Sequence, residues 1–207
     1  MPAHASRTRR TAARFRSWLP RLLARASALL LLASIAAACA APERPAPPVA
    51  IFLLRHAEKE ANDPSDPDLS DAGRARAAAL ATLLEHAGVT HLYATEFKRT
   101  QQTLTPLAKG CGRSIAVVPA NAPQQLVATL LELPPGSVAV VAGHSNTIPA
   151  IARALGATVD DLETGPEGEV LPDYGRLLLV VISAHGPAHG PASHGAPRTL
   201  RLQVGGE

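Results

Sequence analysis

Residues 49–59, VAIFLLRHAEK, place an apolar run directly before a polar cluster, and this junction is the most informative feature of the sequence for its fold. The run from Val49 to Leu54 is continuous, rich in strand-forming residues and bounded by polar residues, so it predicts a buried strand. Arg55, His56 and Glu58 follow where that strand ends. Ligands of open α/β sheets bind at the carboxyl ends of the strands, so this cluster is a candidate functional site.

The rest of the domain alternates predicted helices and strands. Ser70 is a candidate N-cap for a helix over 71–87, and Thr95 for a helix that ends at Ala108. Further helices are predicted over 124–133 and 146–155, and further strands over 90–94, 115–118, 137–142, 176–182 and 199–204. This alternation predicts one α/β domain over 49–207, a three-layer α/β/α sandwich with a mostly parallel central sheet.

Residues 1–39 are predicted to be an export signal that is not part of the domain. Seven arginines precede the first acidic residue, Glu43, and an apolar run over 28–35 leads through small residues to Cys39. The apolar run is shorter than the roughly 20 residues that a membrane-spanning helix needs. Small residues directly before a cysteine resemble a bacterial lipobox, so Cys39 is a predicted lipidation site, with a plain cleaved signal as the alternative. Residues 40–48 are rich in proline and predict a stiff tether.

Charge is distributed unevenly between the predicted signal and the domain. The chain has 20 Lys and Arg against 17 Asp and Glu, but seven of the arginines precede Cys39, so the remainder is net negative. A negative domain gives no electrostatic reason to expect nucleic-acid binding. Lipidation of Cys39 would leave Cys111 as the other cysteine of the chain, without an intrachain disulfide partner. Such a protein is expected at the cell envelope, on the periplasmic face of the outer membrane if the host is Gram-negative.

Polar clusters also follow two further predicted strands, at residues 95–99 and 143–146. Because the carboxyl ends of parallel strands meet at one edge of a sheet, Arg99 and His144 are expected to converge with Arg55 and His56. Arginine presents a planar fork of donors, so this set suits an anion with several oxygens, such as phosphate. The arginines are also expected to lower the pKa of His56 and to keep it a neutral nucleophile, without a metal or other cofactor.

Three segments resemble branch 1 of the histidine phosphatase superfamily, which is also called phosphoglycerate mutase-like. They are residues 54–59 (LRHAEK), 93–103 (YATEFKRTQQT) and 141–146 (VAGHSN), and they occur in the order of that family. The resemblance implies that His56 is phosphorylated and that water then releases the phosphate. It implies phosphate binding by Arg55, Arg99 and His144, and also by Asn62, six positions after His56.

The proton donor of many relatives, a Glu or Asp soon after the third strand, is missing here. Residues 119–123 read PANAP, and Glu132 lies too late in the chain. General-acid help is commonly worth about a hundredfold to ten-thousandfold, and it matters least for good leaving groups such as phosphohistidine or acyl phosphate. Glu58 is the first candidate substitute, followed by Asp63 and Asp66. The alternative for all three acids is a solvated loop.

The main prediction is a phosphatase that hydrolyses phosphomonoester, acyl phosphate or phosphohistidine groups of a small molecule or a phosphoprotein. A mutase is disfavoured, because the segment between Val118 and Ser137 is too short for the large cap of the mutases in this superfamily. One alternative is a lipoprotein on the same fold that binds phosphate or a phospho-ligand without turnover. Another is an envelope lipoprotein with a purely structural role.

Two further groups of titratable residues are predicted not to form metal or cation sites. His185, His189 and His194 lie in a segment rich in Gly, Pro and Ala, which is predicted to be a linker in preference to a metal site. The acidic residues between 160 and 169 are predicted to form a solvated hairpin and not a cation site.

Overall fold

The structure is a computed structural model that describes residues 45–166, 168–183 and 198–204. The predictions for the export signal, for Cys39 and for His185, His189 and His194 lie outside the described residues. Within the described part of the chain, no helix has the length and apolar character needed to cross a membrane.

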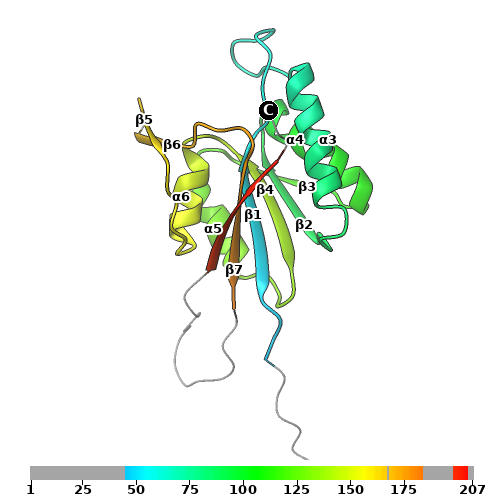
Figure 1. Ribbon diagram of the computed structural model, residues 1–207, viewed down its shortest axis with the longest axis vertical. Helices are drawn as coiled ribbons and strands as arrows, with labels where there is room; N and C mark the ends of the chain where they lie inside the picture. Colours follow the sequence, from blue (N-terminus) through cyan, green and yellow to red (C-terminus); the bar gives the residue numbers. More distant parts are fainter. Residues whose placement is uncertain (1–44, 167, 184–197, 205–207) are drawn as a thin grey trace, which may run out of the picture. The chain divides into compact units, whose positions relative to one another are not determined.

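A six-stranded sheet has the order β3-β2-β4-β1-β7-β8 (Figure 1). Its strands are β1 (Val49–Arg55), β2 (His91–Thr95), β3 (Ile115–Val118), β4 (Val138–Gly143), β7 (Arg176–Ile182) and β8 (Arg198–Gln203). The first four strands are mutually parallel, whereas β7 runs antiparallel to its neighbours β1 and β8. The predicted, mostly parallel sheet is therefore confirmed.

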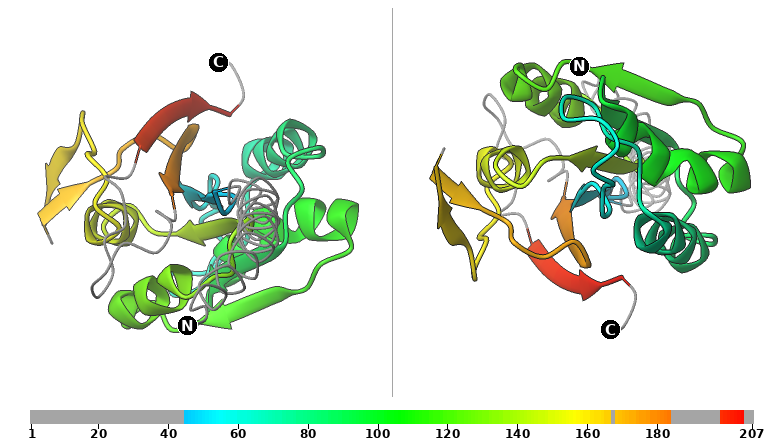
Figure 2. Two further views of the ribbon diagram at one scale, coloured as in Figure 1. Left: turned by 90° about the horizontal axis from the view of Figure 1, so that it is seen from below. Right: turned by 90° about the horizontal axis from the view of Figure 1, so that it is seen from above.

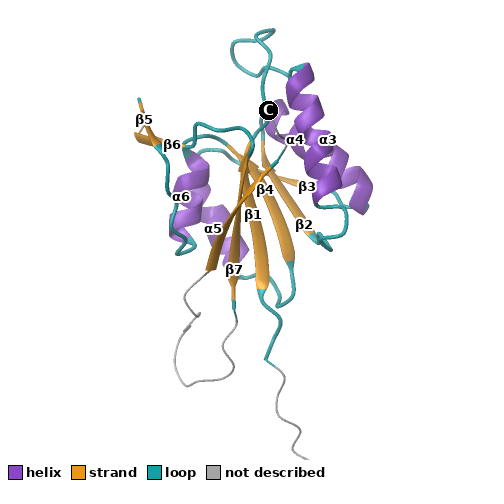
Figure 3. Ribbon diagram, in the orientation of Figure 1, coloured by secondary structure: helices purple, strands orange, loops and turns teal. Residues whose placement is uncertain are grey.

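Helices cover both faces of this sheet and complete the three predicted layers (Figures 2 and 3). α3 (Asp71–Leu83) and α4 (Lys98–Cys111) pack on one face, and α5 (Pro123–Leu131) and α6 (Thr147–Ala154) on the other. Successive side chains of β1 alternate between the faces: Leu54 lies in the core with α3 and α4, and Leu53 in the core with α5 and α6. Burial on both faces explains why this strand is a continuous apolar run in the sequence.

Helix α3 begins against the chain segment that follows β1. Ser70 caps it as predicted, and its Oγ accepts a hydrogen bond from the N–H of Gly73 at 3.2 Å. A Cβ atom at Gly73 would lie 2.1 Å from the carbonyl oxygen of Glu58, so this close approach requires glycine. The helix ends at Leu83, four residues before the predicted end at residue 87. The next residue, Leu84, has non-helical backbone angles, and its side chain is buried in the core.

Helix α4 is capped from a distant part of the sequence. The prediction that Thr95 is its N-cap is wrong, because the Thr95 hydroxyl is engaged by other side chains and Phe97 occupies the N-cap position without a capping bond. The backbone N–H of Lys98 instead donates to the carboxylate of Asp66 at 2.9 Å. An anion at the first turn also interacts favourably with the helix dipole.

The acidic segment before β7 forms the predicted hairpin. Its strands β5 (Glu163–Gly165) and β6 (Gly168–Val170) pair antiparallel as a separate two-stranded sheet.

Candidate active site

The register of the strands brings the polar clusters to one edge of the sheet. Arg55 of β1 pairs with Gly143 of β4, and the N–H of His56 donates to the carbonyl of Gly143 at 2.9 Å. The residues that follow the two strands therefore meet, and the ring centroids of His56 and His144 are 5.6 Å apart. β2 pairs with the other edge of β4, so Thr95 reaches His144, with Oγ1 3.0 Å from Nε2.

A pocket of about 620 Å³ opens at this edge. Arg55, His56, Arg99 and His144 all line it, so the structure brings together these predicted site residues. The other lining residues are Lys59, Phe97, Ala120, Asn121, Ser145, Asn146, Thr147, Pro166 and Val170.

His56 is held as a neutral imidazole with one free nitrogen. The residue is 5% exposed, and its Nδ1 lies 2.7 Å from the carbonyl oxygen of Ala57. A carbonyl can only accept, so Nδ1 carries the proton and Nε2 keeps a lone pair. The pKa of His56 is lowered to about 4, chiefly by burial; the Ala57 bond opposes this shift, and Arg99, His144 and Arg55 contribute to it. The predicted direction is confirmed, but burial contributes more than the arginines.

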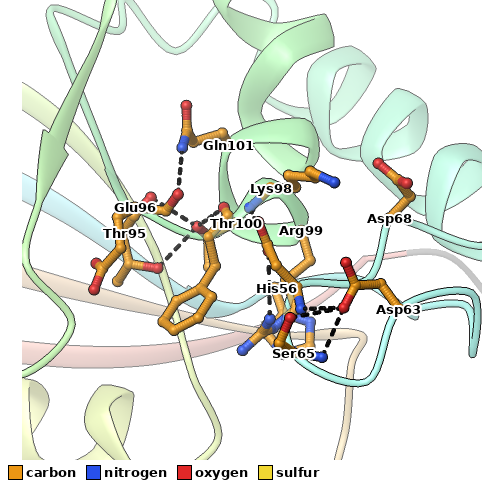
Figure 4. A network of polar contacts seen from close by, with 12 residues as sticks. His56, Asp63, Ser65, Asp68, Thr95, Glu96, Lys98, Arg99, Thr100 and Gln101 are labelled. Carbon is orange, nitrogen blue, oxygen red and sulfur yellow. Dashed lines mark hydrogen bonds and ion pairs between the residues drawn. The ribbon is translucent and has the colours of Figure 1, made fainter.

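Two threonine hydroxyls orient His144: that of Thr95, the last residue of β2, and that of Thr100, in the first turn of α4. Figure 4 shows these two threonines. Thr100 Oγ1 has one proton, which it donates to the backbone carbonyl of Phe97 at 2.7 Å or of Thr95 at 3.0 Å. It must then accept from the Thr95 hydroxyl at 2.9 Å, so the Thr95 oxygen accepts in turn from Nε2–H of His144. Nδ1 is therefore the nitrogen of His144 that remains for a ligand. Burial and the charge of Arg99 are the main causes that lower the pKa of His144 to about 4.

Both pocket arginines have a buried donor without a hydrogen-bond partner among the described residues. Arg55 is fixed by two backbone carbonyls, at 3.2 and 2.9 Å from Nη1, and by the hydroxyl of Tyr174, at 3.0 Å from Nη2. Nε of Arg55 and Nη1 of Arg99 are buried and donate no hydrogen bond to any described residue. An unsatisfied buried donor costs about 1–3 kcal/mol, so an oxyanion that accepts from these groups is a favoured ligand.

Tyr174 is a site residue that sequence reasoning missed. Besides its hydrogen bond, its ring centroid lies 4.0 Å from Cζ of Arg55 and 5.9 Å from the ring centroid of His56. Tyr174 is 119 positions from Arg55 and lies in an irregular segment before β7, so no local pattern points to it. Thr95 and Thr100 belong to the segment 93–103 that resembles the histidine phosphatases, but their role in orienting His144 depends on the fold.

Glu58 does not line the pocket, and its predicted role as proton donor is not supported. Arg76 of α3 holds the carboxylate through Nε, at 2.9 and 3.0 Å, and through Nη2, at 2.6 Å. The hydrogen bond from Arg76 lowers the pKa of Glu58. A carboxylate that is ionised and paired in this way is a poor general acid.

The loop after β1 forms its own turn and keeps the other candidates out of the pocket. Asn62, predicted to contact phosphate, instead donates to Asp68 at 3.0 Å and accepts from its N–H at 3.2 Å. Asp63 accepts from the hydroxyl and N–H of Ser65, and these bonds lower the pKa of Asp63 to about 2. Asp66 caps α4 and lies 3.8 Å from Nη1 of Arg99. The described residues contain no group of three His, Cys, Asp or Glu side chains that is arranged to hold a metal.

Solved structures show which class of fold carries this site. The fold is shared with "Mycobacterial hydrolase 2" (15% identity, TM-score 0.54, 75% of this chain and 90% of that chain). It is also shared with the putative phosphohistidine phosphatase SixA from Agrobacterium tumefaciens (20%, 0.50, 74% and 97%). A third example is the mycobacterial glucosyl-3-phosphoglycerate phosphatase in complex with VO3 (17%, 0.52, 75% and 99%). The chain thus has the α/β fold of the histidine phosphatases.

Sequence comparisons point in the same direction over part of the chain. Residues 51–121 match the model of the histidine phosphatase superfamily (branch 1). The probable phosphoglycerate mutase GpmB of Yersinia enterocolitica is 27% identical over 142 residues, which cover 65% of this chain and 61% of that protein. The protein of the same name from Cronobacter sakazakii is 31% identical over 75 residues, 33% of this chain and 35% of that protein. The matched region therefore spans less than two thirds of the length of either relative.

The hydrogen bonds from His144 to Thr95 and from Thr95 to Thr100 lead to a testable prediction. Thr95→Val is expected to weaken phosphate binding about tenfold, as measured by calorimetry with inorganic phosphate. Valine keeps the shape of threonine but leaves Nε2–H of His144 without an acceptor, a loss of about 1–3 kcal/mol. Thr95→Ser restores the acceptor and is expected to bind within about twofold of the wild type. Equal affinities of the valine and serine variants would contradict the inferred role of the hydroxyl.

The lowered pKa of the buried His56 predicts that the folded protein loses stability in mild acid. The pKa of His56 is about 4 in the folded protein against 6.5 for the free side chain. Between these values the unfolded chain binds a proton that the folded chain does not, so stability is fully present above about 6.5 and is lost as the pH falls toward 4. The expected loss for His56 is on the order of 3 kcal/mol at pH 4, measured by urea unfolding in phosphate-free buffer. His56→Gln should flatten this dependence and the exposed His86→Gln should not; parallel curves for all three proteins would sink the prediction.

Proposed function

We propose that this protein is a phosphatase in which His56 attacks phosphorus and carries the phosphoryl group until water removes it. The observation that carries the proposal is the fixed tautomer of His56. Its Nδ1–H is held by the Ala57 carbonyl, which leaves the Nε2 lone pair in a pocket shared with Arg55 and Arg99. A buried neutral imidazole beside two guanidinium groups is suited to attack an anionic phosphoryl centre.

The surrounding groups match the charge that develops on the transferred phosphoryl group. The buried donors of Arg55 and Arg99 that have no hydrogen-bond partner among the described residues supply hydrogen bonds to its oxygens. A bound anion favours the protonated ring of His144, whose Nδ1–H then donates to a further oxygen. Because the Arg55 guanidinium is anchored to Tyr174 and to the backbone, this arrangement needs little reorganisation during the reaction.

Hydrolysis is proposed over mutase activity. The connection from β3 to α5 consists of residues 119–122, and α5 ends at Leu131, so no large cap is inserted between β3 and β4. Water therefore has a short path to a phosphohistidine at His56. A mutase must instead return the phosphoryl group to its substrate before water reaches it. The two relatives are named as probable phosphoglycerate mutases, so mutase activity is the alternative to test.

The direct test is phosphate release from p-nitrophenyl phosphate, acetyl phosphate and a phosphohistidine peptide by the purified protein. We expect turnover that is unchanged by EDTA, since the proposed chemistry uses side chains alone. Activity that EDTA abolishes and Mg²⁺ restores would contradict a metal-independent phosphatase. Phosphate-dependent thermal stabilisation without product from any substrate would instead favour a binding protein, a candidate supported by the lack of a carboxylic acid among the described pocket residues.

We also propose that the protein is exported and anchored by lipid on Cys39, so that a phosphorylated small molecule or phosphoprotein is met at the cell envelope. The support is the arginine-rich and apolar head that ends in small residues before this cysteine. Radiolabelled palmitate is expected to label the wild type and Cys111→Ala but not Cys39→Ala. Labelling of Cys39→Ala, or none of the wild type in a host that processes lipoproteins, would refute the anchor.

A further inference from the structure

The pocket is larger than a single phosphoryl group needs. Arg55, Arg99, His56 and His144 account for the phosphoryl site, yet the volume of about 620 Å³ extends to residues that this site does not use. These include Lys59 and Asn121. The leaving group of the substrate must lie in this remaining part, so its side chains select the leaving group.

No Asp or Glu is among the described residues that line the pocket. Four acids close in sequence to the site are engaged elsewhere: Glu58 with Arg76, Glu60 with Arg74, Asp66 with the start of α4, and Glu96 with the N–H of Ala120 at 2.8 Å. The described lining of the pocket therefore offers the leaving group no carboxylic acid as a proton donor. An oxygen whose conjugate acid is strong can depart without such a donor, whereas an ordinary alkoxide cannot.

Lys59 adds a positive charge that the phosphoryl site does not need. It is exposed at the pocket, and its side chain forms no hydrogen bond or ion pair with any described residue. Its backbone is held by the isolated bridge to Leu69, which keeps the residue at the pocket. An ammonium group in this position attracts an anionic leaving group and repels a cationic one, such as a protonated imidazole.

We infer that the site takes phosphoanhydrides, in which the phosphoryl group is joined through oxygen to a second phosphate, and that Lys59 binds this second phosphate. The inference rests on the proposed phosphatase function and names its substrate class. Inorganic pyrophosphate and nucleoside diphosphates share this chemistry. Their leaving group is anionic and departs as a phosphate or nucleotide without prior protonation.

The reaction balances without a further reactant. Nε2 of His56 forms a bond to the terminal phosphorus while the bond from phosphorus to the bridging oxygen breaks, and the bridging oxygen keeps the electron pair. Water then attacks the phosphohistidine, the bond between nitrogen and phosphorus breaks, and its electrons return to Nε2. The water proton is released to solvent. The sum converts pyrophosphate and water to two phosphates, or a nucleoside diphosphate and water to nucleoside monophosphate and phosphate.

The test compares kcat/KM on pyrophosphate, ADP, acetyl phosphate and p-nitrophenyl phosphate for the wild type, Lys59→Gln and the control Lys109→Gln, an exposed lysine outside the pocket. The wild type is expected to prefer at least one anhydride to p-nitrophenyl phosphate. Lys59→Gln should lower the ratio of kcat/KM on the anhydride to kcat/KM on p-nitrophenyl phosphate by about tenfold, mainly through KM, and Lys109→Gln should not. The pyrophosphate and ADP arms show which source of the shared chemistry is preferred.

The other outcomes separate an error in the substrate class from an error in the proposed phosphatase function. If Lys59→Gln leaves the ratio unchanged, or if p-nitrophenyl phosphate is turned over but neither anhydride is, the substrate class is wrong and the phosphatase stands. Turnover of the phosphohistidine peptide alone also overturns the substrate class and leaves the phosphatase standing. Failure on all four substrates and on that peptide overturns the proposed function, and this inference falls with it.

Discussion

His56→Ala is expected to lower the turnover of p-nitrophenyl phosphate by at least about ten-thousandfold. The variant removes the nitrogen that is proposed to form the bond to phosphorus. His144 cannot take its place without rearrangement, because its Nε2 donates to Thr95 and its Nδ1 is assigned to a phosphoryl oxygen. The remaining arginines would still bind phosphate, so we expect KM to change much less than kcat.

The intermediate provides a second readout for the same variant. Wild-type protein quenched in alkali during turnover of a ³²P-labelled substrate should carry label that is lost in acid, as phosphohistidine is. His56→Ala should carry none. His86→Ala, an exposed histidine outside the pocket, is the matched control and should keep activity and label. Activity of His56→Ala within about tenfold of the wild type, or acid-labile label in that variant, would refute the role of His56.

Arg99→Ala is expected to lower kcat/KM on p-nitrophenyl phosphate by about a hundredfold to a thousandfold. Nη1 of Arg99 is buried without a hydrogen-bond partner among the described residues, and the guanidinium packs 4.3 Å from the ring centroid of Phe97. The side chain is thus oriented before substrate binds and supplies charge where the transition state develops it. Arg99→Lys should recover little of the loss, because an ammonium group lacks the planar fork and the stacking face.

Arg113→Ala is the matched control, since Arg113 is exposed beyond the end of α4 and does not line the pocket. Thermal unfolding separates catalysis from folding. Removing an unsatisfied buried donor should leave the unfolding temperature of Arg99→Ala close to that of the wild type. A loss of less than about tenfold, or full rescue by lysine, would show that Arg99 does not act on the phosphoryl group.

The agreement between sequence and structure is best where one strand is buried on both faces. Residues 49–55 pair with β4 on one side and β7 on the other, and helices cover both faces, so almost every side chain must be apolar. That constraint is visible without knowledge of the partners. It also positions His56, because the first residue after a fully buried strand necessarily lies at the carboxyl edge of the sheet. The same reasoning located Arg99 and His144.

The failures concern side chains whose direction depends on a competing partner. Glu58 is two residues from His56, yet Arg76 captures it from 18 positions away. Asn62 has the expected spacing from His56 but pairs with Asp68 in a loop that closes on itself. Thr95 was predicted to cap a helix, and the cap came from Asp66. In each case spacing predicted a residue's neighbourhood but not its hydrogen bonds.

The amino-acid sequence was sufficient to predict the α/β sandwich, its mostly parallel sheet and the convergence of Arg55, His56, Arg99 and His144. Hydrophobic periodicity and strand ends are local properties of a chain, so they can be read along it. Three features are visible only in the folded protein: the tautomers of the two histidines, the anchoring of Arg55 by Tyr174, and the pairing of Glu58 with Arg76 outside the pocket. Each of these features depends on which hydrogen-bond donors and acceptors meet in the folded protein. Tyr174, for example, is more than a hundred positions from Arg55 in the sequence. Whether two such groups form a hydrogen bond depends on their distance and direction, which the sequence does not give.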